Sequence, residues 1–349
     1  MSTAEIEMDQ AATPTASNIA PQAAEPSSAL GYVDSLFDIE VAKDKRHLAR
    51  IRICAPGSDT PVRNPHYAFT KDLLLVLQFW LNDDGQSGGI KSNLMLTGPT
   101  GSGKTTLVEQ TAARTGHGVV KVGCHGDLEY EDLIGRYVLN ERGGMSYQDG
   151  PVVRAMREGH ILLLDEINFL KPEVVGGLNG VLDGGTLFIA ATGERVQPHR
   201  NFRIAATGNA IDGTDAAKYR GVKRQNDSML DRFLLGLQLT YMDPEQERLL
   251  LARMYPHLNE DIIEIMMEVT ANTRRAQENG ELSVSISTRV LLHGWARHTQ
   301  RYGTARRAQA AALVNALRVS MLFRVPATDR ATIEATVTGL ITRKGYDKA

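Results

Sequence analysis

The sequence predicts an α/β domain, with a parallel sheet flanked by helices, followed by a second, helical domain. Short apolar runs alternate mostly with segments long enough for a helix, which is typical of a parallel sheet buried on both faces. A glycine-rich motif that can bind phosphate follows the first run. Beyond Asp243 and Pro244 helical periodicity replaces the strand-like runs. We expect strands at residues 94–96, 119–122, 161–164, 202–206 and 234–239, and later helices at 245–254, 261–277, 288–300, 305–323 and 328–342.

The length and composition indicate a folded chain with more than one structural unit. The sequence has 349 residues, of which 42% are hydrophobic and 23% are charged, close to the average of globular proteins. These values exclude a wholly disordered, collagen-like or disulfide-rich chain. The 39 basic and 41 acidic residues give a formal net charge of -2, so no overall positive field attracts nucleic acid or anionic lipid.

The composition divides the chain into four segments. Residues 1–31 are mainly small, polar or proline residues and are expected to form a disordered tail. Residues 32–65 alternate short apolar patches with turn residues, which indicates an N-terminal arm or a small appendage. Residues 66–242 hold the predicted strands, preceded by a helix at 69–81, and residues 243–349 form the helical domain.

No segment is predicted to direct the chain out of the cytoplasm or into a membrane. The longest strongly apolar stretch, at 73–81, is about half as long as a membrane-spanning helix needs to be. The first basic residue is Lys43, so a signal peptide is not expected.

The cysteines and histidines do not form a recognisable metal motif. Cys54 and Cys124 are far apart in the sequence, without a CxxC pair. The histidines near the predicted strands lack the spacing of a metal site, so we assign them no role; they are His117, His125, His160 and His199.

Residues 98–105 match the pattern GxxxxGK followed by Ser or Thr at every fixed position. The glycines let the loop curl so that backbone N–H groups and a helix N-terminus face a phosphate. Lys104 would neutralise charge on the β- and γ-phosphates, and the Thr105 hydroxyl would ligate Mg²⁺. The expected nucleotide-binding residues are Gly98, Pro99, Thr100, Gly101, Ser102, Gly103, Lys104, Thr105 and Thr106.

An apolar strand at 161–164 ends in two adjacent carboxylates, Asp165 and Glu166. Because neighbouring residues of a strand point in opposite directions, the two can do different work. We expect Asp165 to contribute to the Mg²⁺ site, together with Thr105, and Glu166 to act as the base for hydrolysis.

Three further polar residues are candidates for the same chemistry. Asn209 follows the strand at 202–206, where its amide could hold the attacking water or contact the γ-phosphate, or could lie in an ordinary turn. Arg232 and Arg289 are candidates for guanidinium groups that stabilise transferring phosphoryl oxygens, although most arginines are solvated surface residues. Arg289 would lie in the first turn of a helix, which is unfavourable for a cation unless an anion binds there.

In this order, the motifs resemble those of AAA+ ATPases, P-loop NTPases with a C-terminal α-helical lid. Within that superfamily, residues 65–303 are similar to the MoxR group, which includes the ATPase subunit of aerobic cobaltochelatase and the ATPases that activate rubisco or nitric oxide reductase. Residues 132–137 with Gly150 and Pro151 resemble the helix 2 insert of the group, and residues 182–196 resemble the hairpin before sensor 1. The stretches 64–69, 219–233 and 286–289 resemble the cobaltochelatase subunit in particular.

The resemblance implies ATP and Mg²⁺ as ligands and assigns roles by position. Asn209 corresponds to sensor 1, Arg289 to sensor 2, and Arg232 to the finger that reaches a neighbouring subunit's ATP, with Arg220 and Arg224 as fallback fingers. It also implies a hexameric ring that acts on a partner with a von Willebrand A domain. One departure is Gly123, where relatives often have a polar residue that restrains the catalytic glutamate.

Three biological tasks are compatible with these motifs. The first is remodelling or activation of a partner protein, and the second is driving a metal-insertion complex of the cobalt or magnesium chelatase kind. The third is a nucleic-acid-directed motor of a restriction or phage system, which the near-neutral net charge disfavours.

Overall fold

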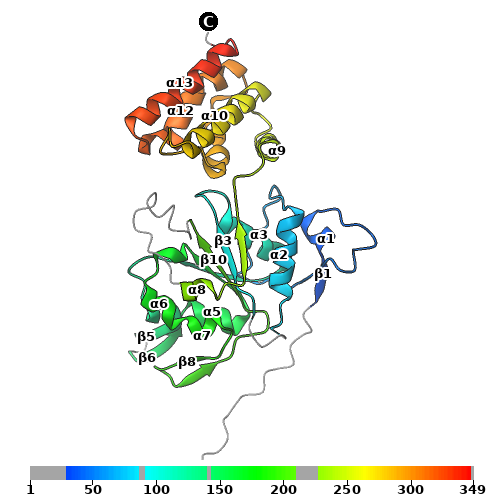
Figure 1. Ribbon diagram of the computed structural model, residues 1–349, viewed down its shortest axis with the longest axis vertical. Coiled ribbons are helices and arrows are strands. Elements are labelled where there is room, and N and C mark those ends of the chain that lie inside the picture. Colours follow the sequence, from blue (N-terminus) through cyan, green and yellow to red (C-terminus); the bar gives the residue numbers. More distant parts are fainter. Residues whose placement is uncertain (1–28, 86–90, 140–142, 210–226, 347–349) are drawn as a thin grey trace, which may run out of the picture.

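The computed structural model describes residues 29–85, 91–139, 143–209 and 227–346 (Figure 1). Its centre is a five-stranded parallel sheet with the order β11-β3-β10-β7-β4. All five predicted strands are confirmed, with ends that differ from the predicted ones by at most two residues. They are β3 (Leu94–Thr97), β4 (Val119–Gly123), β7 (Ile161–Asp165), β10 (Arg203–Gly208) and β11 (Leu235–Gln238).

Helices cover both faces of this sheet, as the continuous apolar runs require. Alternate residues of β7 enter different cores. Ile161 and Leu163 pack with the cluster around the helices at 71–82 and 104–115, and Leu162 and Leu164 pack with the cluster around the helices at 151–158 and 172–177. The helices of this domain are α2 (Lys71–Asn82), α3 (Lys104–Thr115), α4 (Tyr130–Ile134), α5 (Pro151–Glu158), α6 (Pro172–Gly177), α7 (Asn179–Leu182) and α8 (Asp227–Leu230), with a 3-10 turn η1 (Ile167–Phe169).

Two antiparallel hairpins extend from the α/β domain. β5 (Gly135–Leu139) pairs with β6 (Met145–Asp149) between α4 and α5, and β8 (Leu187–Ile189) pairs with β9 (Glu194–Val196) before β10. They occupy the positions of the helix 2 insert and of the hairpin before sensor 1 that the sequence indicated. In Figure 1 both lie at the lower left of the domain, beside α5 and α7.

The N-terminal arm is part of the main domain. β1 (Leu30–Tyr32) pairs antiparallel with β2 (Arg50–Arg52), and α1 (Val33–Phe37) follows β1. The predicted tail at 1–31 is therefore too long, because Leu30 and Gly31 pair with Arg52 and Ile51. The rest of that tail, 1–28, lies outside the described residues. Buried Val33, Phe37 and Ile51 share the core of α2, which anchors the arm on the sheet.

The C-terminal helices form a lid domain with its own core, joined to β11 by a short link (Figure 1). The lid begins at a capped helix, because the Asp243 side chain accepts hydrogen bonds from the backbone N–H groups of Glu245 and Gln246. Its elements are α9 (Pro244–Met254), α10 (Glu260–Glu278), η2 (Val290–Ala296), α11 (Arg297–Thr299), η3 (Gln300–Tyr302), α12 (Arg306–Ser320), η4 (Leu322–Arg324) and α13 (Ala327–Arg343).

One predicted helix differs in form. The segment predicted as a helix at 288–300 is π-helical over most of its length, at η2, and passes through α11 into a 3-10 turn, η3. Packing against α12 accounts for the difference: Gly294 lies against Ser320, and the buried Trp295 indole donates a hydrogen bond to the Leu313 carbonyl at 2.9 Å. These tertiary contacts outweigh the ordinary α-helical preference of the sequence.

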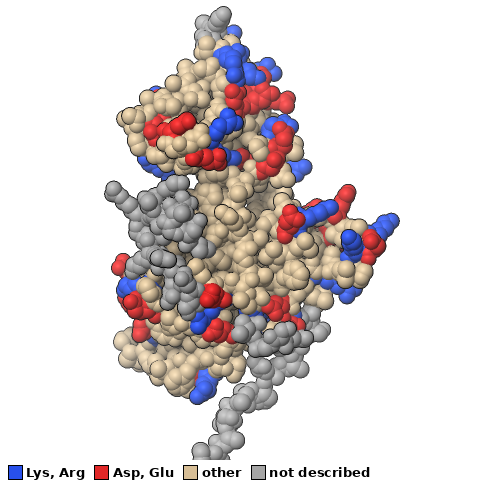
Figure 2. All heavy atoms as spheres, viewed as in Figure 1, with Lys and Arg blue, Asp and Glu red and all other residues tan. Residues whose placement is uncertain are grey.

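Charged side chains of both signs are interspersed over the lid and around α1 on the face shown in Figure 2. This mixture agrees with the near-zero net charge. In the part of the chain that the structure describes, no helix is long and apolar enough to cross a bilayer.

Candidate functional site

The glycine-rich loop connects β3 to α3 and needs glycine at three positions. Gly98, Gly101 and Gly103 have φ angles of 135°, 80° and 92°, in the region that glycine adopts readily. A side chain on Gly98 would collide with the carbonyl oxygen of Leu239, and one on Gly101 would lie 2.7 Å from the Ser287 hydroxyl. The loop therefore touches both the end of the sheet and the lid.

Lys104 is the first residue of α3 and is only 7% exposed. Its ammonium donates hydrogen bonds to the carbonyls of Gly98 and Pro99, at 2.8 and 3.0 Å, and to Asn209 Oδ1 at 2.8 Å. Burial lowers the pKa of Lys104 to about 8, although Asp165 and Glu166 act in the opposite direction. Its donors thus point into the loop, where a phosphate would compete for them.

Asp165 is held by two hydroxyl groups from neighbouring elements. Its Oδ1 accepts hydrogen bonds from Thr105 at 2.8 Å and from Thr207 at 2.7 Å. Burial alone would raise the pKa of Asp165, but these bonds and the nearby Lys121, 3.4 Å from Oδ2, lower it below its usual value. An ionised carboxylate beside a threonine hydroxyl offers the hard oxygen ligands that Mg²⁺ prefers.

Glu166 has an unusual backbone conformation for a residue with a side chain, with φ 61° and ψ 47°. Its N–H donates to the Thr207 hydroxyl at 2.9 Å, and its Oε1 lies 3.5 Å from Asn209 Nδ2. A left-handed conformation at a non-glycine residue costs roughly 1–3 kcal/mol, and such strain concentrates at functional sites. The turn directs the Glu166 carboxylate toward Asn209 rather than back into the sheet.

The lid reaches the loop through residues 286–289. Ser287 and the exposed Arg289 approach Gly101, and the Arg289 charge is close enough to lower the pKa of Lys104. The sequence-predicted residues Lys104, Thr105, Asp165, Glu166, Asn209 and Arg289 therefore come together around one loop.

Arg232 lies elsewhere. Its Nε is 2.9 Å from Asp183 Oδ1, and its carbonyl accepts a hydrogen bond from Asn93, the residue before β3. Because the glycine-rich loop follows the other end of β3, the structure does not bring Arg232 to the loop of its own chain. The fallback residues Arg220 and Arg224 lie outside the described residues.

A buried ion pair fixes the lid segment that approaches the loop. Arg274 makes two bonds of 2.9 Å to the Glu247 carboxylate, which is fully buried, and also donates to the Ile286 carbonyl at 3.0 Å. Its guanidinium lies 4.2 Å from the centre of the Tyr241 ring, whose hydroxyl is 3.4 Å from the Thr100 carbonyl. A chain of contacts thus runs from the lid to the glycine-rich loop.

Sequence reasoning missed several of these residues. Thr207 could have been found, because it lies near the end of the strand that precedes Asn209. Lys121 also lies on a predicted strand, but no motif marks it. Arg274 and Glu247 are 27 residues apart and carry no local signal, since only the packing of α9 against α10 brings them together.

The loop fits a nucleotide phosphate with its Mg²⁺. The Ser102 hydroxyl is buried without a hydrogen-bond partner, which leaves a polar group of the loop unsatisfied. Thr105 and Asp165, which are hydrogen-bonded to each other, would offer oxygen ligands to a metal ion, and Lys104 would add a positive charge beside them. These features match a loop that binds a phosphate and a divalent cation.

Two protein-family models match separate parts of the chain. Residues 93–233 match an AAA domain of the dynein-related subfamily, and residues 247–340 match the C-terminal domain of CbbQ, NirQ and NorQ. The first match covers four of the five strands of the sheet and ends just before β11, and the second covers most of the lid.

Several known proteins are similar in sequence to parts of this chain. An uncharacterised protein of Staphylococcus haemolyticus is 35% identical over 207 residues, which cover 58% of this chain and 76% of that protein. Midasin of Dictyostelium discoideum is 31% identical over 225 residues, 64% of this chain but 4% of midasin. Among solved structures, a "putative ATPase" from Cytophaga hutchinsonii is 18% identical, with a TM-score of 0.39, covering 79% of this chain and 92% of that one.

The lowered pKa of Lys104 predicts that nucleotide affinity depends on pH. In the free protein Lys104 loses its proton as pH rises through about 8, while a bound polyphosphate favours the protonated form. ATP affinity should therefore fall above pH 8 by up to about tenfold per pH unit. Calorimetric titrations from pH 7 to 9.5 would measure this, with Lys104→Arg as the control. An equal slope in that variant would assign the effect to another group.

The two roles of Arg274 should be separable by mutation: its ion pair with Glu247 affects the stability of the lid, and its hydrogen bond to Ile286 affects nucleotide binding. Arg274→Met leaves a buried carboxylate unpaired and should destabilise the lid by about 3–5 kcal/mol. The double variant Arg274→Met with Glu247→Leu should recover most of that loss, because both charges are gone. The ATP affinity of this double variant should nevertheless stay below that of the wild type, because the hydrogen bond from Arg274 to the Ile286 carbonyl is missing. Urea unfolding and ATP titration test both points; wild-type affinity in the stable double variant would contradict the positioning role.

Proposed function

Because the chain belongs to the MoxR group of AAA+ ATPases, we propose that it binds ATP with Mg²⁺ at the loop before α3 and hydrolyses it. The observation that carries this proposal is the shared carboxylate of Asp165, bonded to Thr105 and Thr207 beside Glu166 and Asn209. Gly98 to Thr106 would surround the phosphates, with Lys104 as the main positive charge. Mg²⁺, held by Thr105 and Asp165, would neutralise charge that develops on the phosphates.

Glu166 is proposed as the general base. Its exposed carboxylate lies beside the Asn209 amide, so it is able to accept a proton from the attacking water. Asn209 would orient this water through its amide. In the structure the same amide bonds Lys104, so nucleotide binding at Lys104 and the position of Glu166 are connected through one side chain.

Gly123 stands where related ATPases often have a polar side chain that restrains the catalytic glutamate, and Asn209 could provide this restraint instead. Gly123 lies directly beside Asp165 in the β4–β7 pairing and has no side chain to hold the glutamate. Burial and the two nearby carboxylates raise the pKa of the next residue, Cys124, to about 12, so its thiol stays protonated. We propose that Asn209 takes over the restraint of Glu166 from the glycine position.

The assembly is proposed to be a hexameric ring. Arg232 lies at the opposite end of β3 from the glycine-rich loop and would need a second chain to meet a nucleotide. Arg289, in contrast, approaches the loop of its own chain and would stabilise charge on the γ-phosphate in cis. These positions support a finger role for Arg232 and a sensor role for Arg289.

The biological task is proposed to be remodelling or activation of a partner protein, one with a von Willebrand A domain. The match of the lid to the CbbQ, NirQ and NorQ C-terminal domain supports this task over a chelatase motor. The two hairpins expose large apolar side chains, Leu139, Met145 and Phe188, that a partner protein could cover. The proposed location is the cytoplasm.

Replacing Glu166 tests the hydrolytic mechanism. Glu166→Gln should bind ATP with normal affinity, because the side chain keeps its size, but should lower turnover by about 10²- to 10⁴-fold. Phosphate release and ATP titration measure the two effects. Glu173→Gln, an exposed change on α6, is the matched control and should retain normal turnover. Near-normal turnover of Glu166→Gln would remove Glu166 from its role.

Mixing inactive subunits tests the ring and the finger. Arg232→Ala and Lys104→Ala should each lose turnover when alone. In mixed rings, an intact loop from the first variant can meet Arg232 of the second at about a quarter of the interfaces, so partial activity should return. Sedimentation checks that both variants assemble. Mixed assemblies without any recovered turnover would argue against a finger that acts between chains.

A further inference from the structure

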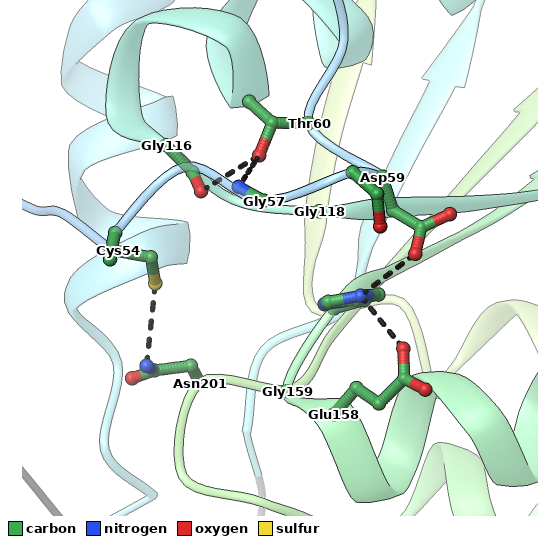
Figure 3. Close-up of a pocket in the computed structure, with 12 residues that line it drawn as sticks. Cys54, Gly57, Asp59, Thr60, Gly116, Gly118, Glu158, Gly159 and Asn201 are labelled. Carbon is green, nitrogen blue, oxygen red and sulfur yellow. Dashed lines mark hydrogen bonds and ion pairs between the residues drawn. The ribbon is translucent and has the colours of Figure 1, made fainter.

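A polar pocket lies at the amino-terminal ends of the strands, and the glycine-rich loop lies at their carboxyl ends. It has a volume of about 400 Å³ and is formed where the N-terminal arm meets the starts of β4 and β7. The carboxylates of Asp59 and Glu158, both labelled in Figure 3, each pair with Nε2 of His160. None of the proposed nucleotide-binding or catalytic residues lines this pocket.

We propose that Asp59, Glu158 and His160 form a binding site for a divalent transition-metal ion of the Zn²⁺ type. His160 Nε2 lies 2.9 Å from Glu158 Oε2 and 3.5 Å from Asp59 Oδ2, and the three ligand atoms all lie within 4.8 Å of one another. Ligands at zinc bond lengths in a tetrahedron are about 3.4 Å apart, so the observed separations suit one shared ion. One imidazole and two carboxylates are ligands that Zn²⁺ accepts, with a position left for water.

The backbone holds these ligands in place before any ion binds. Gly159, with φ 70°, ends α5, so Glu158 and His160 lie on either side of a tight turn. The His160 ring packs on Gly118, where a side-chain carbon would lie 2.6 Å from the ring. Asp59 is fixed by its carbonyl, which accepts a hydrogen bond from the Val119 N–H at 2.9 Å. Ligands fixed in this way lose little conformational freedom on binding.

One neighbouring cation would compete with the ion. Arg154 Nη1 lies 3.5 Å from Asp59 Oδ1, but its side chain is 44% exposed and can turn into solvent. The thiol of Cys54 also lines the pocket, but it is paired with Asn201 at the far end in Figure 3 and is not a proposed ligand. An ion at this site would tie the arm, through Asp59, to the turn between α5 and β7.

The test is titration of the full chain, stripped with chelator and free of nucleotide, with zinc chloride in a calorimeter. The wild type should bind one Zn²⁺ per chain with a Kd of about 1 µM or tighter and should melt at a higher temperature with the metal. His160→Ala and Asp59→Asn should each weaken Zn²⁺ binding by more than about 100-fold. This loss is larger than the one expected when a residue that only hydrogen-bonds a metal ligand is removed. Arg154→Ala should tighten it by about two- to fivefold, because a competing charge is removed.

Controls separate this site from others that bind metal. His47→Ala removes an exposed histidine away from the pocket and should leave Zn²⁺ binding unchanged. Asp165→Asn should also retain it, because Asp165 belongs to the proposed Mg²⁺ site. If His160→Ala does not fold, Glu158→Gln serves instead, since Glu158 is about half exposed. A wild type without stoichiometric Zn²⁺ binding, or binding that persists in folded His160→Ala or Glu158→Gln, would overturn the proposal.

Discussion

The hydrogen bonds that Asp165 accepts from Thr105 and Thr207 hold the candidate site together. Thr105 lies in the first turn of α3 and Thr207 is next to last in β10, so one carboxylate connects three neighbouring parts of the fold. This is feasible because β3, β10 and β7 are parallel and in register, which brings their carboxyl ends to one edge. The strained turn at Glu166 depends on the same arrangement, since its N–H bonds the Thr207 hydroxyl. The chemistry of the site is therefore a direct product of the sheet's strand order.

The lid contributes to this edge through a few polar contacts rather than through a continuous apolar interface. The two domains have separate cores, and the contact runs through Ser287 and Arg289 of the lid and through Tyr241 of the link, which stacks on Arg274 of the lid. Arg274 organises that contact from inside the lid by bonding Glu247 and the Ile286 carbonyl. A buried pair of this kind adds little net stability, because the desolvation of two charges offsets much of their attraction. Its effect is to fix the position of the lid segment 286–289 relative to the glycine-rich loop.

The sequence was sufficient for the sheet and the motifs because both are local signals. The buried strands show as apolar runs, and the residues around the phosphate loop are consecutive, as are Asp165 and Glu166. It was insufficient where contacts join distant segments. The pair of Glu247 and Arg274, and the group of Asp59, Glu158 and His160, form only when helices and turns pack. The π-helical turn at η2 and the pairing of Leu30 were missed for the same reason, since tertiary packing decides both.

The close approach of Gly98 to Leu239 has a consequence for building chimeras. Leu239 follows β11, bonds the Thr97 carbonyl through its N–H, and leaves no room for a side chain on Gly98. Although Leu239 and Tyr241 precede the lid helices in the link, they belong structurally with the phosphate loop. A lid taken from a relative should accordingly be joined at the Asp243–Pro244 helix start, and it must bring an arginine that can stack on Tyr241. A junction placed at the end of β11 would exchange part of the nucleotide loop's wall along with the lid.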